Sequence, residues 1–154
     1  EWESFLGLKN MAYGAMGENL CVDGLDESCV YVGDIHKIGS LVLQVSQPRK
    51  PCFKLSKRWG NENMATHIFE TGLTGWYYRV LTPGSCKAGD AIEVIESDPV
   101  HMSILEINRF FYAPSENLNL LEKFNALTTL TNGWHDDMKR RIEGIYSTEF
   151  MRTL

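Results

Sequence analysis

Residues 35–46 read Ile35-His36-Lys37-Ile38-Gly39-Ser40-Leu41-Val42-Leu43-Gln44-Val45-Ser46 and carry the clearest strand signal in this chain of 154 residues. Apolar side chains recur at every second position from Leu41 to Val45, as in a strand with one buried face. Gly39-Ser40 is a two-residue link of the glycine-first kind that favours a tight turn. The stretch therefore predicts an antiparallel hairpin of residues 35–38 and 41–46.

Further short strands are predicted after this hairpin. Residues 76–82 alternate in the same way before the turn Thr82-Pro83-Gly84-Ser85, and residues 91–96 form the last strand. Residues 53–71 contain few β-branched pairs and predict two short helices, while residues 1–16 predict a short amphipathic helix that runs into a loop. Residues 1–99 are thus predicted to form a mainly β domain, a barrel or a sandwich.

The apolar period changes to about 3.6 residues after Asp98-Pro99. Ser103 and Glu106 have the spacing of a capping box, which predicts a helix from residue 104 that ends near Ala113. Two more helices are predicted over residues 117–128 and 133–143. Residues 100–154 therefore form an appended three-helix domain. Its predicted inward side chains are Ile104, Ile107, Phe111, Leu118, Leu121, Phe124 or Leu127, Trp134, Met138 and Ile142.

Composition places the chain among soluble globular proteins, with 44% hydrophobic residues and a mean hydropathy of −0.22. No stretch approaches 18 consecutive apolar residues, so no membrane span is predicted. The four cysteines form no C-x-x-C pair, which favours reduced thiols in a cytoplasmic protein. The chain opens Glu1-Trp2 without an initiator Met or a signal peptide, so we expect it to start partway through a longer protein.

Positive charge is concentrated in one segment. The formal net charge is −5, yet residues 49–58 carry Arg49, Lys50, Lys54, Lys57 and Arg58 and no acidic side chain. This segment is either a solvated helix face or a local anion site. Nucleic acid is the disfavoured anion, because a pI near 5.4 repels a long polyanion from the rest of the chain.

Cys52 lies within this basic segment, after a turn stiffened by Pro48 and Pro51 and before a predicted helix. A helix N-terminus and nearby cations both favour thiolate over thiol. The alternative is that Cys52 is a small apolar filler, as free cysteines often are. An anionic sulfur beside cations suits either a nucleophile or a thiolate ligand to a metal whose other ligands come from a cofactor.

Several short motifs together resemble the MOSC domain of the bacterial YiiM family. The C-terminal part resembles the three-helix domain that follows MOSC in that family, so the resemblance covers nearly the whole chain. It implies a MOSC-type β-barrel. The motifs are Gly17-Glu18-Asn19-Leu20, Gln47-Pro48-Arg49-Lys50-Pro51-Cys52-Phe53-Lys54-Leu55, Thr71-Gly72, Gly75-Trp76-Tyr77, Gly89-Asp90 and Lys139-Arg140-Arg141.

The resemblance implies binding of the molybdenum cofactor (molybdopterin) and reduction of small N-hydroxylated compounds, such as hydroxylaminopurine-type bases and amidoximes. A separate electron donor protein would re-reduce the metal. Cys52 is implied as the catalytic thiolate ligand to molybdenum. Arg49 and Lys54 are expected to pair with the cofactor phosphate or tune the thiolate. The full set of implied cofactor-binding residues is Glu18, Asn19, Gln47, Arg49, Cys52 and Lys54.

One departure from the family concerns the N-terminal side. Family members carry further barrel strands and a His-Gly-Gly segment before the point where this chain begins. We therefore expect a barrel that is incomplete at its N-terminus and is completed by a missing segment or by a second copy in a homo-oligomer.

Two other functions that would use Cys52 stay open. A cofactor-free thiol or persulfide enzyme would use Cys52 as its nucleophile, with a distant histidine as base. A non-catalytic carrier would bind and hand on the cofactor or a sulfur atom.

Overall fold

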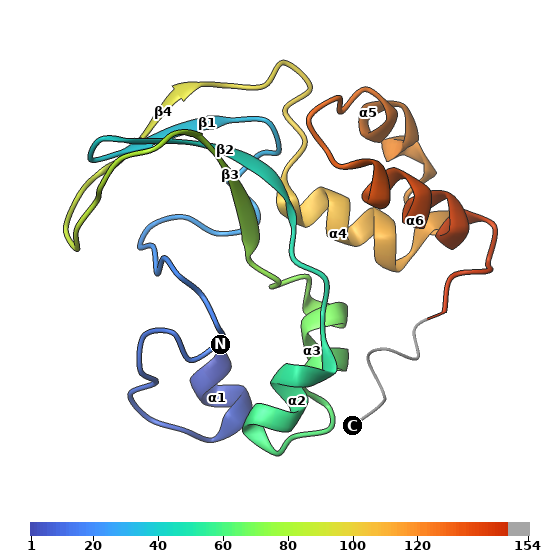
Figure 1. Cartoon of the computed structure of the whole chain (residues 1–154). Coiled ribbons are helices and arrows are strands. Elements are labelled where there is room, and N and C mark those ends of the chain that lie inside the picture. The colour runs from blue at the N-terminus through green and yellow to red at the C-terminus, as the bar shows by residue number, and fades with distance from the viewer. Residues whose placement is uncertain (148–154) are drawn as a thin grey trace.

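The computed structural model describes residues 1–147 as a curved sheet with helices below it and on one side (Figure 1). The predicted fold class, mainly β with appended helices, is confirmed. The elements are α1 (Trp2–Leu6), β1 (Ile35–Ile38), β2 (Leu41–Pro48), α2 (Phe53–Trp59), α3 (Met64–Thr71), β3 (Trp76–Thr82), β4 (Ile92–Glu96), α4 (Ile104–Tyr112), α5 (Leu121–Asn125) and α6 (Asn132–Ile142), with 3-10 turns η1 (Pro114–Glu116) and η2 (Leu118–Leu120).

The four strands form one antiparallel sheet in the order β3-β2-β1-β4. The predicted hairpin is confirmed: β1 pairs with β2 from Ile38 opposite Leu41 to Ile35 opposite Gln44. Gly39 has φ 59°, and a side chain there would collide with the carbonyl of Ser85. β2 extends two residues beyond the predicted end at Ser46 because Gln47 and Pro48 still pair with β3.

One apolar core joins the sheet side of the chain to the C-terminal helices. Val30, Val32 and Val45 are fully buried against side chains of α4, α5 and α6. A smaller cluster packs α2 and α3 against α1. The boundary predicted at residue 99 stays a prediction, since it lies beside a core that both parts share. The remaining residues of the main cluster are Met102, Ile104, Ile107, Phe110, Phe111, Phe124, Leu127, Leu130, Trp134 and Met138.

The segment between β4 and α4 is held by several hydrogen bonds. The amide of Asp98 donates to Asp34 Oδ1 at 2.8 Å, and the amide of Val100 donates to Asp98 Oδ1 at 2.9 Å. Gly33, at φ 97°, packs so closely on Asp98 that any side chain at this position would overlap it. The capping box of α4 is present as predicted, with both the Ser103 and the Glu106 bonds formed.

Two details of the predicted helices are wrong. Residues 117–128 form a 3-10 turn and the short helix α5 instead of one helix, and Leu118 is 54% exposed. The Leu120 amide donates to the Asn117 carbonyl, three residues back, at 2.9 Å, so the first turn has 3-10 pairing in place of α-helical pairing. Ile142, expected to face inward, is 42% exposed at the last residue of α6.

Across residues 1–147 we find no helix that combines the length and the apolar character needed to cross a membrane.

Candidate functional site

Cys52 lies at the junction between the sheet and the lower helices. β2 ends at the buried Pro48, and Cys52 is the extended N-cap residue of α2, with φ −144° and ψ 136°. The prediction that Cys52 begins a helix is therefore confirmed. Its backbone carbonyl accepts a hydrogen bond from the Leu55 amide at 3.1 Å. The thiol is half-buried and unbridged, as is that of Cys86, while Cys21 and Cys29 are exposed.

Arg49 fixes a loop from the N-terminal part of the chain. Its Nη1 donates to the carbonyl of Met16 at 2.6 Å. In the same loop the Glu18 carboxylate accepts hydrogen bonds from the amides of Gly14, at 2.6 Å, and Met16, at 2.9 Å. Two of the predicted site residues, Glu18 and Arg49, are thus brought to one loop, where both bind backbone groups of the protein itself.

The backbone of Arg49 is fixed as well. Its amide donates to the carbonyl of Gly75 at 3.1 Å, and the amide of Gly75 donates to the buried carboxylate of Glu27 at 2.7 Å. This pairing connects the segment before Cys52 to the loop that leads into β3. Burial raises the pKa of Tyr112, which lies nearby on α4, and the negative charge of the Glu27 carboxylate raises it further.

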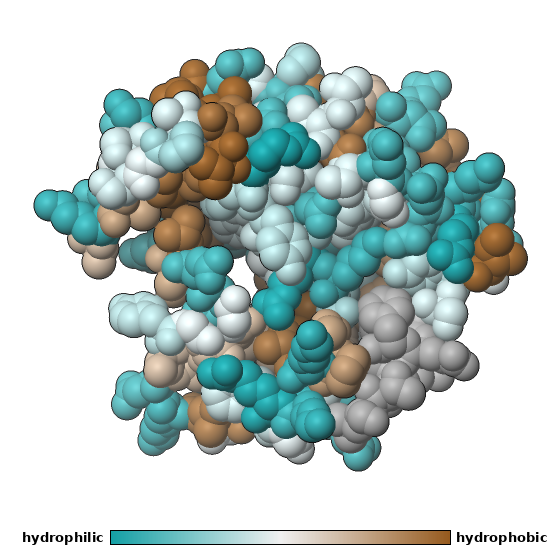
Figure 2. Space-filling model, in the orientation of Figure 1, coloured by the Kyte–Doolittle hydropathy of each residue, from teal (hydrophilic) through white to brown (hydrophobic). Residues whose placement is uncertain are grey.

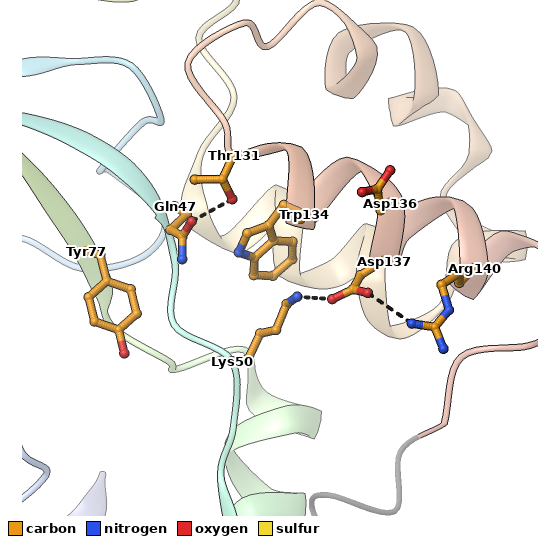
Figure 3. Close-up of a pocket in the computed structure, with 9 residues that line it drawn as sticks. Gln47, Lys50, Tyr77, Thr131, Trp134, Asp136, Asp137 and Arg140 are labelled. Carbon is orange, nitrogen blue, oxygen red and sulfur yellow. Dashed lines mark hydrogen bonds and ion pairs between the residues drawn. The ribbon is translucent and has the colours of Figure 1, made fainter.

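Lys50 turns to the opposite side, toward α6 (Figure 3). Its ammonium forms an ion pair with Asp137, which also contacts Arg140 Nη1 at 3.5 Å. The same ammonium lies 4.8 Å from the ring centroid of Trp134 and 5.8 Å from that of Phe111. Lys50 therefore joins the segment between β2 and α2 to the C-terminal helices and is no free cation beside Cys52.

Gln47 lies on the same side as Lys50. Its Oε1 accepts a hydrogen bond from the Thr131 hydroxyl at 2.8 Å, across 84 positions of sequence. These side chains line a cavity of about 540 Å³ between the end of β2 and α6 (Figure 3). The other residues of its lining are Tyr77, Gly133, Trp134, Asp136, Asp137 and Arg140.

The remaining basic side chains are solvated. Lys54, Lys57 and Arg58 of α2 are exposed, and so is Asn19 in its loop. The structure places the six predicted site residues in different surroundings: Glu18 and Arg49 at the N-terminal loop, Gln47 at the α6 cavity, Cys52 at the start of α2, and Asn19 and Lys54 in exposed positions. The first two cations of the basic segment bind groups of the protein itself and the last three face water, so an anion site in this segment stays a prediction.

Sequence reasoning did not find the wall that α6 contributes to the cavity. It assigned Trp134 to the apolar stripe of the core, and the ring is indeed 2% exposed. The indole N–H of Trp134 was the one local sign that this residue does more than fill the core, since a buried tryptophan usually needs a hydrogen-bond acceptor. The Thr131–Gln47 contact had no local signal, because the two residues meet only through the tertiary fold.

Inside the sheet a buried polar pair joins β1 and β3. His36, 1% exposed, contacts the Tyr78 hydroxyl through Nδ1 at 2.8 Å. Burial lowers the pKa of His36, an effect that the neighbouring Asp34 carboxylate opposes. Burial also raises the pKa of Tyr78.

Comparison with known proteins identifies the family. The family model of the MOSC domain matches residues 1–93. YiiM from Escherichia coli is 46% identical over 131 residues, 84% of this chain and 58% of that protein. A protein named "Reductase" from Gibberella moniliformis is 36% identical over 136 residues, 88% of this chain and 24% of that protein.

The fold comparison agrees with the sequence comparison. The crystal structure of YiiM from Geobacillus stearothermophilus matches with a TM-score of 0.83 and 33% identity, over 92% of this chain and 72% of that chain. The curated relatives are longer proteins, and the chain spans 24% to 66% of their lengths. The chain belongs to the MOSC domain family, within its YiiM group.

Proposed function

We propose that this chain is the cofactor-binding part of a molybdenum-dependent reductase of N-hydroxylated compounds, with Cys52 as the thiolate ligand to molybdenum. The observation that carries the proposal is the position of Cys52: a half-buried, unbridged thiol, held between a proline-stiffened strand end and α2. Membership of the MOSC family and the similarity to a protein named "Reductase" support an oxidoreductase role.

The donor set is compatible with this cofactor. Within residues 1–147 no group of three or more histidine, cysteine or acidic side chains could hold a bare metal ion. A pterin cofactor brings its own sulfur ligands, so the protein needs to add only one soft donor. Cys52 can provide that donor. When bound, the cofactor supplies the oxygen-atom transfer chemistry, and the protein supplies position and charge.

The residues around Cys52 have separable roles in this proposal. Arg49 and Glu18 hold the 14–18 loop through backbone bonds, which keeps the segment before Cys52 in place. Asn19 and Lys54 are exposed and have no hydrogen bond or ion pair among the described side chains, so they are available to a pterin edge and to a phosphate. Gln47 lies near the end of β2, on the side of the cavity, where its Oε1 accepts the hydrogen bond from Thr131.

The overall reaction needs further components. Reduction of R–NHOH to R–NH₂ and water breaks the N–O bond and consumes two electrons and two protons. A separate electron donor protein is the proposed source of the electrons, and the substrate is a small N-hydroxylated base or amidoxime.

The exposed apolar surface of the sheet is where a further segment or a second copy would bind. Figure 2 shows apolar residues gathered over the strands. The apolar side chains of Val80 and Leu81 in β3 and of Val94 and Ile95 in β4 are 44% to 56% exposed. Both are edge strands with unpaired backbone groups in the described part of the chain, and such edges favour pairing.

Two alternatives use the same cysteine without this chemistry. A thiol or persulfide enzyme needs a base beside the sulfur, and among residues 1–147 no histidine is hydrogen-bonded to Cys52. A carrier that hands on the cofactor needs no turnover. Analysis of the molybdenum content distinguishes the thiol or persulfide enzyme from the proposed reductase. Turnover of an N-hydroxylated substrate with a reduced electron donor distinguishes the carrier from the proposed reductase.

The test replaces Cys52 by serine, which is close in size but a much poorer ligand for a soft metal. Cys52→Ser is expected to lose molybdenum-dependent reduction of an N-hydroxylated purine while it stays folded. Cys86→Ser is the matched control, because its thiol is also half-buried and unbridged, and it should keep the activity. Wild-type turnover in Cys52→Ser would refute the ligand assignment.

A further inference from the structure

The solvent side of α2 gathers three cations. Lys54, Lys57 and Arg58 have the i, i+3, i+4 spacing that places side chains next to one another on one face of a helix. All three are exposed, whereas Leu55 and Ser56 on the other side of the helix are buried. α2 lies at the lower edge of the molecule (Figure 1), so this α2 basic face is open to a partner.

The three cations are not neutralised within the described part of the chain. Among residues 1–147 none of them forms a hydrogen bond or an ion pair. Glu1 and Glu3, beside the neighbouring α1, bind a histidine and a backbone amide. Glu62, in the turn after α2, and Glu70, near the end of α3, are exposed and lie beyond ion-pair distance of the cations. The face therefore carries three uncompensated positive charges.

The stability of the helix does not explain this arrangement. Lys57 and Arg58 lie in the last turn, where the helix dipole favours cations, but Lys54 lies in the first turn, where the dipole disfavours them. Lys54 and Arg58 also form a like-charge pair at i, i+4, which destabilises a helix. An acidic partner would relieve both effects.

The charge of the rest of the chain orients such a partner. Outside residues 49–58 the chain carries 10 basic and 20 acidic side chains. An acidic protein is therefore repelled by most of the surface and attracted to the α2 basic face, which selects one docking orientation.

One cation of the face is already held in place. The guanidinium carbon of Arg58 lies 5.7 Å from the ring centroid of the half-buried Trp59, as in a cation–π contact. Arginine and tryptophan are the residue types that contribute most often to binding energy at protein interfaces. This pair gives the face a partly ordered anchor.

The α2 basic face is close to Cys52. α2 begins directly after Cys52, and its seven residues span about 10 Å along the helix axis. Electron transfer between proteins slows steeply with distance, so an electron donor has to dock near the proposed metal ligand. We propose that the α2 basic face docks the acidic protein that donates the two electrons of the reduction. This inference rests on the function proposed above.

The test titrates the full chain with a flavodoxin, a small acidic flavoprotein that carries electrons, by isothermal titration calorimetry. We expect saturable binding that weakens by roughly tenfold or more between about 0.02 M and 0.5 M salt. Lys57→Glu combined with Arg58→Glu should weaken binding by roughly tenfold or more at about 0.1 M salt. Lys54 stays unchanged in this variant, because a role toward the cofactor phosphate is proposed for it.

The matched control combines Lys87→Glu with Lys139→Glu, two exposed lysines on other parts of the chain. Both double variants change the net charge from −5 to −9, since each reversal changes it by two. At about 0.1 M salt charges more than about 10 Å apart are largely screened, so the control should bind within about twofold of wild type.

Three results would overturn the proposal: no flavodoxin binding at low salt, equal affinity of the two double variants, or tighter binding of a DNA duplex or phosphatidylserine vesicles than of flavodoxin. Molybdenum content, measured on the same preparations, tests the proposed function separately. Molybdenum without flavodoxin binding would refute the docking face alone. Flavodoxin binding by a chain that never takes up molybdenum would refute the reductase, and with it the role of the face in electron donation.

Discussion

Asn108 is the side chain through which α4 holds the loop that leads to β3. It is 1% exposed, and its Nδ2 donates to the Gly72 carbonyl at 2.8 Å and to Thr74 Oγ1 at 2.9 Å. The same loop continues to Gly75, whose carbonyl pairs with the Arg49 amide. A change at Asn108 should therefore reduce stability and loosen the segment that precedes Cys52.

The size of the effect follows from these two bonds. Asn108→Ala removes two hydrogen bonds of about 1 kcal/mol each and leaves the buried Thr74 Oγ1 without a donor, while the Gly72 carbonyl keeps the Thr74 amide. It also leaves a small void in a packed interior. The free energy of unfolding should fall by about 2–4 kcal/mol.

Urea denaturation followed by circular dichroism measures this loss. Asn117→Ala is the matched control, since Asn117 Nδ2 also donates to two carbonyls, those of Ala113 and Arg109, but closer to the surface. We expect it to lose about 1 kcal/mol or less. If Asn108→Ala lost no more than Asn117→Ala, the view that buried side-chain bonds hold this loop would be refuted.

Two further outcomes are expected. Arg49→Ala removes the 2.6 Å hydrogen bond to the Met16 carbonyl, so it should lower the free energy of unfolding by about 1.5–3 kcal/mol and also lower the molybdenum content. Lys57→Ala, at an exposed position, should change neither quantity. Equal molybdenum content in the two purified variants would contradict this. His36 has a lowered pKa when folded, so the unfolded chain binds more protons and stability should fall as pH drops below about 6.5. In His36→Phe this part of the pH dependence, measured by denaturation at about pH 5 and 7.5, should disappear, and an unchanged slope would exclude His36 as its source.

The parts of the fold that could be predicted are those determined by interactions between residues close together in the sequence. The hairpin at Gly39-Ser40 and the capping box at Ser103 depend on neighbours within a few positions, and both are present. The helix expected over residues 117–128 begins instead with a 3-10 turn, in which the Leu120 amide binds the Asn117 carbonyl three residues back. The periodicity of apolar residues alone does not distinguish these two kinds of backbone pairing.

Only the local surroundings of Cys52 could be predicted from the sequence. The prolines at positions 48 and 51 and the basic residues indicated that Cys52 lies at the start of a helix, and this helix is confirmed. Where the neighbouring cations point was not predictable, because Lys50 and Arg49 are directed by Asp137 and by the Met16 carbonyl, 87 and 33 positions away. Their roles toward a cofactor stay predictions.

The hydrogen bonds at Asp98 have a consequence for how the sheet can move relative to the C-terminal helices. Segments that join a sheet to a helical bundle often act as hinges, because a few backbone torsions can change there. Here the amides of Asp98 and Val100 are both bound to carboxylates, and Gly33 packs directly against Asp98. Bending at this segment would break these contacts, so the two walls of the cavity keep their separation. The sheet and the C-terminal helices are therefore held as one body at this junction, without the hinge that often separates two parts of a chain.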